Sequence, residues 1–295
     1  MPIRDQQKVR LSAVAGMFYE NDPLILRRRL AEAEGKLPPI VPDAAEVKGV
    51  VLPHAGYVFS LPTAMAPLGT LRKKKIGRVI VLGPSHYVGF RGIAASDYSR
   101  WRTPFGDLST ATELFELMEH WNSPLVAVRD DAHEKEHSLE VQFPLIQYFF
   151  GQPEVLPLVV GALSMEDVLT LAPRMAELDA PGTLWIVSSD FTHYGTRFRY
   201  VPFTEEVPER LRAQDHAAAE LIANRDLSGF ASFLGKTGAT ICGMNPIALF
   251  LATLDVIDPA RTFRGEIAAE SNSGELTGDY RNAVGYEGIA FRKQA

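Results

Sequence analysis

The sequence predicts an α/β protein in which a sheet with parallel strands is covered by helices. Runs of four to six residues rich in Val, Ile and Leu recur along the chain, and they are typical of strands buried on both faces. Longer segments with helical periodicity alternate with these runs, which indicates β-α-β units. With 295 residues and 46% hydrophobic composition the chain can bury a large core, so we expect a single domain spanning residues 1–295.

The predicted elements follow one another in a regular order. Asp22 followed by Pro23 predicts the N-cap and first position of a helix that continues to about Glu34. Buried strands are predicted at 47–52, 78–82, 155–160 and 183–188. Further helices are predicted at 61–72, 111–121, 138–150, 165–178, 209–224 and 246–256. Segments 263–270 and 283–292 have the pattern of antiparallel strands joined through a long connection.

Composition argues against several classes of protein. The net charge of -6 does not suit nucleic-acid binding, which needs a basic face. No apolar stretch approaches the roughly 18 residues of a membrane span, and the first residues lack the apolar segment of a secretory signal. The single cysteine cannot form an internal disulfide, which fits a reducing compartment. We therefore expect a cytoplasmic protein with no membrane and no nucleic-acid partner.

Imidazole side chains follow directly on the predicted buried strands. His54 and His86 each end such a run, and Asp190 with His193 ends another. Residues just past the carboxyl ends of parallel strands converge in one crevice despite their separation in sequence. Cys242, just ahead of a predicted helix, could join them.

His54, His86 and Cys242 together have the chemistry of a metal site. Neutral imidazoles and a thiolate suit a transition metal, and catalytic sites keep three protein ligands with one position open. The alternative is that each histidine caps a strand end by hydrogen bonding, while Cys242 is a small buried hydrophobe. The similar placement of several imidazoles favours the metal.

Two further groups could take part in chemistry. Asp190 and His193 could lie side by side, which fixes a histidine for acid/base work, although a structural hydrogen bond at a loop explains them equally well. In the polar segment 133–140, Ser138 is expected to cap a solvated helix start. His137 and Glu140, three residues apart on that helix, could line the crevice.

Six motifs occur in order across nearly the whole chain: Ala13-Val-Ala-Gly-Met-Phe-Tyr, Pro53-His-Ala-Gly-Tyr, Leu82-Gly-Pro-Ser-His, Glu136-His-Ser-Leu-Glu, Ser188-Ser-Asp-Phe-Thr-His-Tyr-Gly and Gly238-Ala-Thr-Ile-Cys-Gly. Together they resemble the MEMO family, whose prokaryotic members are often called AmmeMemoRadiSam system protein B. The resemblance implies the fold of the class III extradiol dioxygenases, a three-layer α/β/α sandwich around a mixed, largely parallel sheet.

The resemblance also implies roles for individual residues. His54, His86 and Cys242 are expected to bind the metal, with Asp190 and His193 beside it as catalytic groups. The expected pocket residues are His137, Glu140, Tyr57 and Ser85.

Cys242 marks a difference from the dioxygenases, which hold Fe(II) with two histidines and a carboxylate. A thiolate is softer, favours copper or zinc more than a carboxylate does, and can itself be oxidised. The expected cofactor is one transition-metal ion, iron or copper, with zinc as a further option. The expected function is that of a metal-dependent oxidoreductase or a metal handler.

The sequence is also compatible with two other functions. One is a metal-free cysteine hydrolase with Cys242 as nucleophile, His193 as base and Asp190 as the orienting acid, which would leave His54 and His86 without a role. The other is a non-catalytic module for a peptide or small ligand. Family association implies AMMECR-type and radical-SAM proteins as partners. The substrate, the native metal and the oligomeric state do not follow from the sequence.

Overall fold

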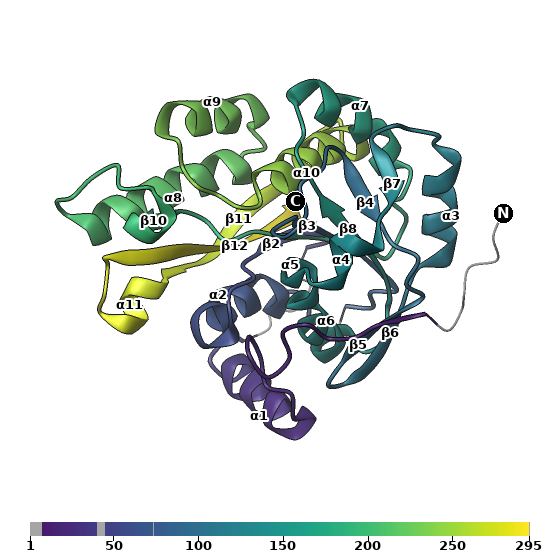
Figure 1. Ribbon diagram of the computed structural model, residues 1–295, viewed down its shortest axis with the longest axis horizontal. Coiled ribbons are helices and arrows are strands. Elements are labelled where there is room, and N and C mark those ends of the chain that lie inside the picture. Colours follow the sequence, from purple (N-terminus) through teal and green to yellow (C-terminus); the bar gives the residue numbers. More distant parts are fainter. Residues whose placement is uncertain (1–7, 40–44, 73, 295) are drawn as a thin grey trace.

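The computed structural model describes residues 8–39, 45–72 and 74–294, and in this part of the chain a nine-stranded mixed sheet forms the centre (Figure 1). Its strands are β2 (Val47–Leu52), β3 (Arg78–Pro84), β4 (Ile93–Ala95), β7 (Val126–Val128), β8 (Glu154–Val160), β9 (Thr183–Ser188), β10 (His193–Gly195), β11 (Phe263–Asn272) and β12 (Asn282–Lys293). The order is β10-β12-β2-β9-β3-β8-β4-β7, with β11 paired to β12.

The parallel part of the sheet is its centre. Strands β2, β9, β3 and β8 run parallel to one another, whereas β12 is antiparallel to β2 and β4 is antiparallel to β8. A smaller sheet contains β1 (Val9–Arg10), β5 (Arg100–Thr103) and β6 (Gly106–Ser109). The carboxyl ends of β2, β9 and β3 therefore lie together at one end of the central strands of the large sheet.

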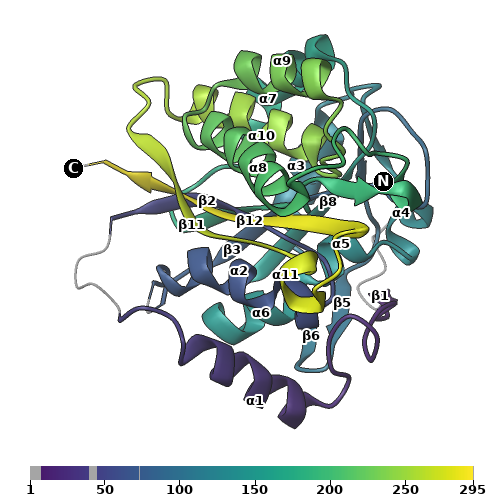
Figure 2. The ribbon, with the colours of Figure 1, turned by 90° about the vertical axis from the view of Figure 1, so that its left-hand side faces the viewer.

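Helices cover both faces of the sheet (Figure 2). On one side are α1 (Pro23–Glu34), α2 (Tyr57–Gly69) and α6 (Gln142–Phe150). On the other side are α3 (Thr112–His120), α7 (Met165–Ala176), α8 (Val207–Ala223), α9 (Leu227–Thr237) and α10 (Met244–Ile257). The short helices are α4 (Asp130–Glu134), α5 (His137–Glu140), α11 (Ser273–Thr277) and a 3-10 turn at Thr196–Phe198. The predicted three-layer α/β/α architecture is confirmed.

Burial on both faces explains the continuous apolar strands. In β3, Ile80 and Leu82 pack into the layer that contains α7 and α10, while Val79 and Val81 pack into the layer that contains α2 and α6. All four side chains are fully buried. Alternation across the pleat thus divides one apolar run between two cores.

Most predicted elements are present with small shifts at their ends. The Asp22 cap is confirmed, since its carboxylate accepts hydrogen bonds from the backbone of Leu24 and Ile25. Helix α2 begins at Tyr57 and not near 61, and the predicted helix 138–150 is divided into α5 and α6. Helix α9 and the short strands β1, β4, β5, β6, β7 and β10 are additional to the predicted elements. Within the described ranges, no helix combines the length and apolar character needed to cross a bilayer.

Candidate metal centre

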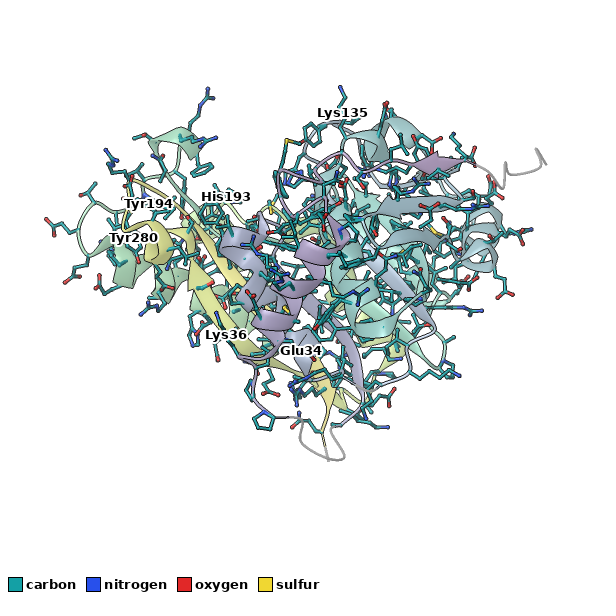
Figure 3. All side chains as sticks on the ribbon, turned by 90° about the horizontal axis from the view of Figure 1, so that it is seen from below. Glu34, Lys36, Lys135, His193, Tyr194 and Tyr280 are labelled. Carbon is teal, nitrogen blue, oxygen red and sulfur yellow. The ribbon has the colours of Figure 1, made fainter. Side chains whose placement is uncertain are left out.

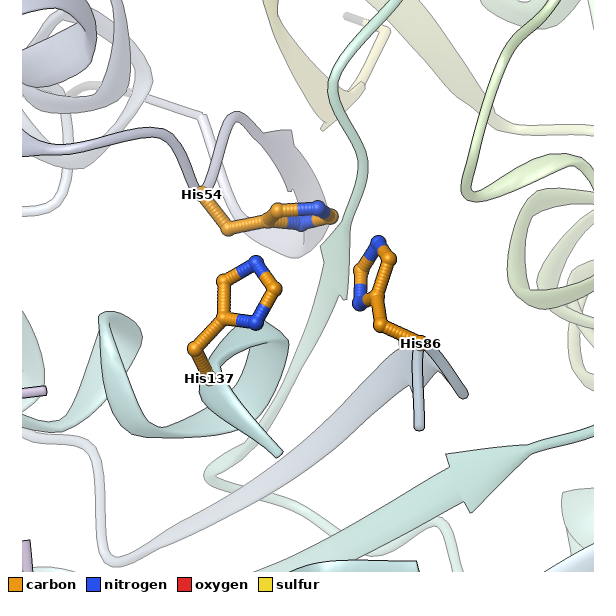
Figure 4. A group of neighbouring side chains, drawn as sticks. All are labelled: His54, His86 and His137. Atoms are coloured by element: carbon orange, nitrogen blue, oxygen red, sulfur yellow. The ribbon is translucent and has the colours of Figure 1, made fainter. Parts of the chain in front are cut away.

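Three histidines from separate elements converge just beyond the carboxyl ends of the parallel strands. His54 follows β2, His86 follows β3, and His137 is the first residue of α5. One ring nitrogen from each lies within 4.8 Å of the others. The ring centroids are 5.2 Å apart for His54 and His86, and 4.5 Å apart for His86 and His137. Figure 4 shows the three rings turned toward a common space.

His54 is fixed from three directions. Its backbone N–H donates to Asp190 Oδ1 at 2.8 Å, and its ring Nδ1 lies 3.0 Å from the Ser188 hydroxyl. Its other ring nitrogen, Nε2, lies 3.3 Å from Cys242 Sγ. Because His54 is only 1% exposed, its ring has little freedom to turn away from this arrangement.

His86 is held by a single buried carboxylate, that of Glu136. The backbone N–H of His86 donates to Glu136 Oε2 at 2.7 Å, and its ring Nδ1 lies 2.9 Å from Oε1. Burial alone would raise the pKa of Glu136, but hydrogen bonds from His86 and Ser138 lower it to about 2. The carboxylate is therefore charged at neutral pH.

The environment keeps two of the rings neutral, as a metal ligand must be. Burial and the nearby His86 hold the pKa of His54 well below its usual value. Burial, with His54 and His86 close by, lowers the pKa of His137 to about 4. His137 Nδ1 is buried without a hydrogen-bond partner in the described chain, although it lies 3.5 Å from Glu136 Oε1. Converging neutral imidazoles with a buried, unpaired nitrogen fit a bound metal ion.

Cys242 lies beside the three histidines, on the His54 side. Its Sγ accepts a hydrogen bond from the Asp190 backbone N–H at 3.2 Å, and burial raises the pKa of the thiol well above its usual value. The next residue makes this position possible, because a Cβ at Gly243 would lie 2.3 Å from the Ser189 Cβ. Cys242 is outside the group whose ligand atoms lie within 4.8 Å, and His137 is the third member instead. Ligation by Cys242 stays a prediction.

Asp190 and His193 both border the site, but they do not support each other as expected. Asp190 Oδ1 accepts hydrogen bonds from the backbone of His54 and Ala55. The ring Nδ1 of His193 instead lies 2.9 Å from the Phe191 carbonyl and 3.0 Å from the Thr240 carbonyl. Backbone carbonyls, and not Asp190, therefore orient the His193 ring.

A cavity of about 550 Å³ opens next to these groups. His137, Asp190 and His193 line it together with the aromatic rings of Phe18, Phe59, Phe198 and Tyr286. Its volume is typical of a small-molecule site, which is usually apolar with a few polar groups. Figure 3 shows His193 beside the recess between the β10 segment and the main body.

The structure places Glu140, Tyr57 and Ser85 outside the lining of this cavity. Glu140 is fully buried, is ion-paired with Arg10, and accepts hydrogen bonds from three further groups of the N-terminal segment. The Tyr57 hydroxyl donates to the Val141 carbonyl, and the Ser85 hydroxyl donates to the Val88 carbonyl. The side chains of all three residues therefore make hydrogen bonds within the fold. The predicted pocket role of Glu140 is not seen, because both of its carboxylate oxygens already have hydrogen-bond partners.

Segment 133–140 differs most from its prediction. It is not a solvated helix start, since His133, Glu136 and Glu140 are each at most 1% exposed. The cap of α5 is also different: the Glu136 side chain accepts from the Ser138 backbone, while the Ser138 hydroxyl donates to the Pro84 carbonyl. No role is predicted for Glu136 or Ser188 from the sequence. The one signal is their position, because Glu136 is adjacent to His137 and Ser188 is two positions before Asp190.

The comparisons with known proteins show the family of this chain. The sequence model of the family described as Memo-like protein matches residues 10–290. The chain belongs to this family. A MEMO1 family protein from Methanopyrus kandleri is 32% identical, with 96% of this chain and 99% of that protein covered. A MEMO1 family protein from Schizosaccharomyces pombe is 28% identical, with 92% and 96% covered.

The chain is also similar to an animal protein and, in its fold, to a solved structure. The memo-1 homolog of Caenorhabditis elegans is 31% identical, with 83% of this chain and 71% of that protein covered. The crystal structure of an uncharacterized protein from Escherichia coli superposes with a TM-score of 0.53 at 14% identity, covering 83% of this chain and 99% of that one. The latter similarity concerns the fold alone.

Proposed function

We propose that this Memo-like chain binds one transition-metal ion and acts as a metal-dependent oxidoreductase or metal handler. The observation that carries the proposal is the convergence of three histidine nitrogens within 4.8 Å, beside a ligand-sized cavity that His137 lines. The pKa values of His54 and His137 are lowered, so both rings are uncharged at neutral pH.

In this proposal His54 and His86 form the core of the site and Cys242 is the third ligand. The 3.3 Å between Cys242 Sγ and His54 Nε2 is close to the separation of two ligands on one tetrahedral ion, about 3.6 Å from usual bond lengths. Because Cys242 is outside the group whose ligand atoms lie within 4.8 Å, its sulfur must approach His86 to complete this set. His137 lies on the cavity side of this set and borders the remaining position. Iron or copper would supply redox chemistry when bound, and zinc would supply Lewis acidity alone.

His193 is the proposed acid/base group. The two carbonyl oxygens near its Nδ1 can only accept hydrogen bonds, so Nδ1 carries the proton and Nε2 is free to accept one. Because His193 lines the cavity, a bound ligand could give its proton to Nε2. Asp190, also in the lining, fixes the backbone that carries His54.

The metal-free cysteine hydrolase has less support. Such an enzyme needs a thiol of lowered pKa next to its base. Here burial raises the pKa of Cys242, and the ring that contacts its sulfur is His54 and not His193.

Oxygen uptake separates an oxidoreductase from a metal handler. Tag-free protein is reconstituted with Fe(II) or Cu(II), supplied with ascorbate as reductant, and followed with an oxygen electrode. An oxidoreductase consumes oxygen faster than the same concentration of free metal. A rate equal to or below that of free metal would contradict an oxidoreductase and leave metal handling.

His193→Ala is expected to leave metal affinity within about twofold of the wild type, because His193 is proposed to lie beside the metal. Oxygen uptake should fall by about 100-fold, the lower range for loss of a general acid or base. Both are measured on the same preparation, by chelator competition and with the oxygen electrode. A large loss of metal affinity would make His193 a ligand instead.

Binding of Zn²⁺ should tighten about tenfold per pH unit between roughly pH 7 and 8.5, above the ordinary titration of histidine. The sign follows from the raised pKa of Cys242: the thiol is protonated in the free protein and must lose its proton to bind. His54 and His137 have lowered pKa values, so they release no proton in this range. Calorimetry in buffers of different ionisation enthalpy measures how many protons are released when Zn²⁺ binds. The same slope in Cys242→Ser would exclude the thiolate as a ligand.

A further inference from the structure

The hydrogen bonds around His54 decide which of its ring nitrogens carries the proton. The Ser188 hydroxyl has one proton to give, and it lies 2.6 Å from the Ser138 carbonyl, which can only accept. Gln142 Nε2 lies 2.9 Å from the same hydroxyl and 3.0 Å from the Pro53 carbonyl. The Pro53 contact fixes the orientation of the Gln142 amide, so the amide donates to Ser188.

The remaining partner of the Ser188 hydroxyl is therefore a donor. With its proton given to Ser138 and one lone pair facing Gln142, the hydroxyl can only accept from His54 Nδ1, at 3.0 Å. Nδ1 then carries the proton, and Nε2 has a free lone pair. The contact between Nε2 and Cys242 Sγ at 3.3 Å is consistent, because a thiol can donate to that lone pair.

The ring of His86 is also protonated on Nδ1, but a different group causes it. Its Nδ1 faces Glu136 Oε1 at 2.9 Å, and an ionised carboxylate can only accept. Glu136 is in turn fixed by the backbone N–H groups of His86 and Ser138, and Arg10 donates to its carbonyl oxygen. Glu136 has no exposed side-chain surface, so water does not replace these contacts.

We infer that Glu136 and the Gln142–Ser188 pair are positioning residues that hold His86 and His54 as the Nδ1-protonated tautomer and leave both Nε2 atoms free for a metal. The two supports come from different elements, Glu136 from the cap of α5 and Ser188 from the end of β9. The inference rests on the proposed metal site for its purpose, but the tautomers themselves belong to the metal-free protein. Such partners of ligating histidines typically affect metal affinity by about 10- to 100-fold.

The test is ¹⁵N NMR of histidine-labelled, metal-free protein, in which long-range correlations distinguish protonated from unprotonated ring nitrogens. Single histidine replacements assign the signals. In the wild type, His54 and His86 are both expected to show protonated Nδ1 and unprotonated Nε2. Detection of the Nε2-protonated form as the main species of either ring would overturn the inference without any variant.

Two variants then test the supports one at a time. Ser188→Ala should mix the tautomers of His54 alone, and Glu136→Gln should change those of His86 alone. Ser123→Ala and Glu134→Gln, away from the rings, are the matched controls and should leave every ring signal in place. Zn²⁺ affinity should fall by about 10- to 100-fold in the two test variants only. Unchanged tautomers in folded test variants would overturn the inference, whereas altered tautomers with unchanged metal affinity would contradict the proposed metal site.

Discussion

Glu140→Ala is expected to destabilise the protein by about 3–5 kcal/mol, because it leaves the Arg10 charge buried without its partner. The Arg10 side chain is 3% exposed and that of Glu140 has no exposed surface. The carboxylate also accepts from Ala13 N at 2.8 Å, Val14 N at 3.0 Å and the Tyr19 hydroxyl at 2.7 Å. Its removal would therefore leave several buried donors unsatisfied at once.

Urea unfolding of the metal-free protein measures this effect as a shift in midpoint at unchanged slope. Glu134→Gln, an exposed acid in the same segment, is the control and should change stability by less than about 0.5 kcal/mol. If Glu140→Ala lowers the free energy of unfolding by less than about 1 kcal/mol, the ion pair does not anchor the N-terminal segment.

Removing both core histidines is expected to weaken metal binding by roughly 10⁴-fold or more. Structural zinc sites with four ligands contribute about 10–16 kcal/mol, or roughly 3 kcal/mol for each ligand, and two ligands would be lost here. The double variant His54→Ala, His86→Ala is compared with His120→Ala, a histidine on the exposed part of α3. Competition with a chromophoric chelator gives both affinities. A double variant that binds as tightly as the control would place the metal elsewhere.

The strands that carry the site could be predicted because their signal is local. Val47–Leu52 and Thr183–Ser188 are buried along their whole length, and each contains a short apolar run that is followed within a few residues by a polar residue of the site. This pattern alone identified His54, His86 and Asp190 as neighbours in space. Helix α9 was missed because Gly229 and Gly235 weaken its local helical signal, and the structure caps it with Asp226.

The surroundings of the site could not be predicted, because they depend on contacts far apart in sequence. From the sequence alone Glu136 resembles a solvated acid. Only the fold brings His86, 50 residues away, into contact with it. Glu140 resembles a crevice residue until Arg10, 130 residues away, is paired with it. Burying a charge is unfavourable unless a partner compensates for it, and only the fold supplies these partners.

The most direct test of the metal site is a crystal structure of the protein loaded with one metal, with anomalous diffraction recorded on both sides of its absorption edge. We expect one strong peak per chain between the His54 and His86 rings, about 2.0–2.1 Å from each Nε2. Sulfur at bonding distance would identify Cys242 as the third ligand, and nitrogen of His137 in its place would correct the ligand set. A strong peak elsewhere with none between these two rings would contradict the central claim.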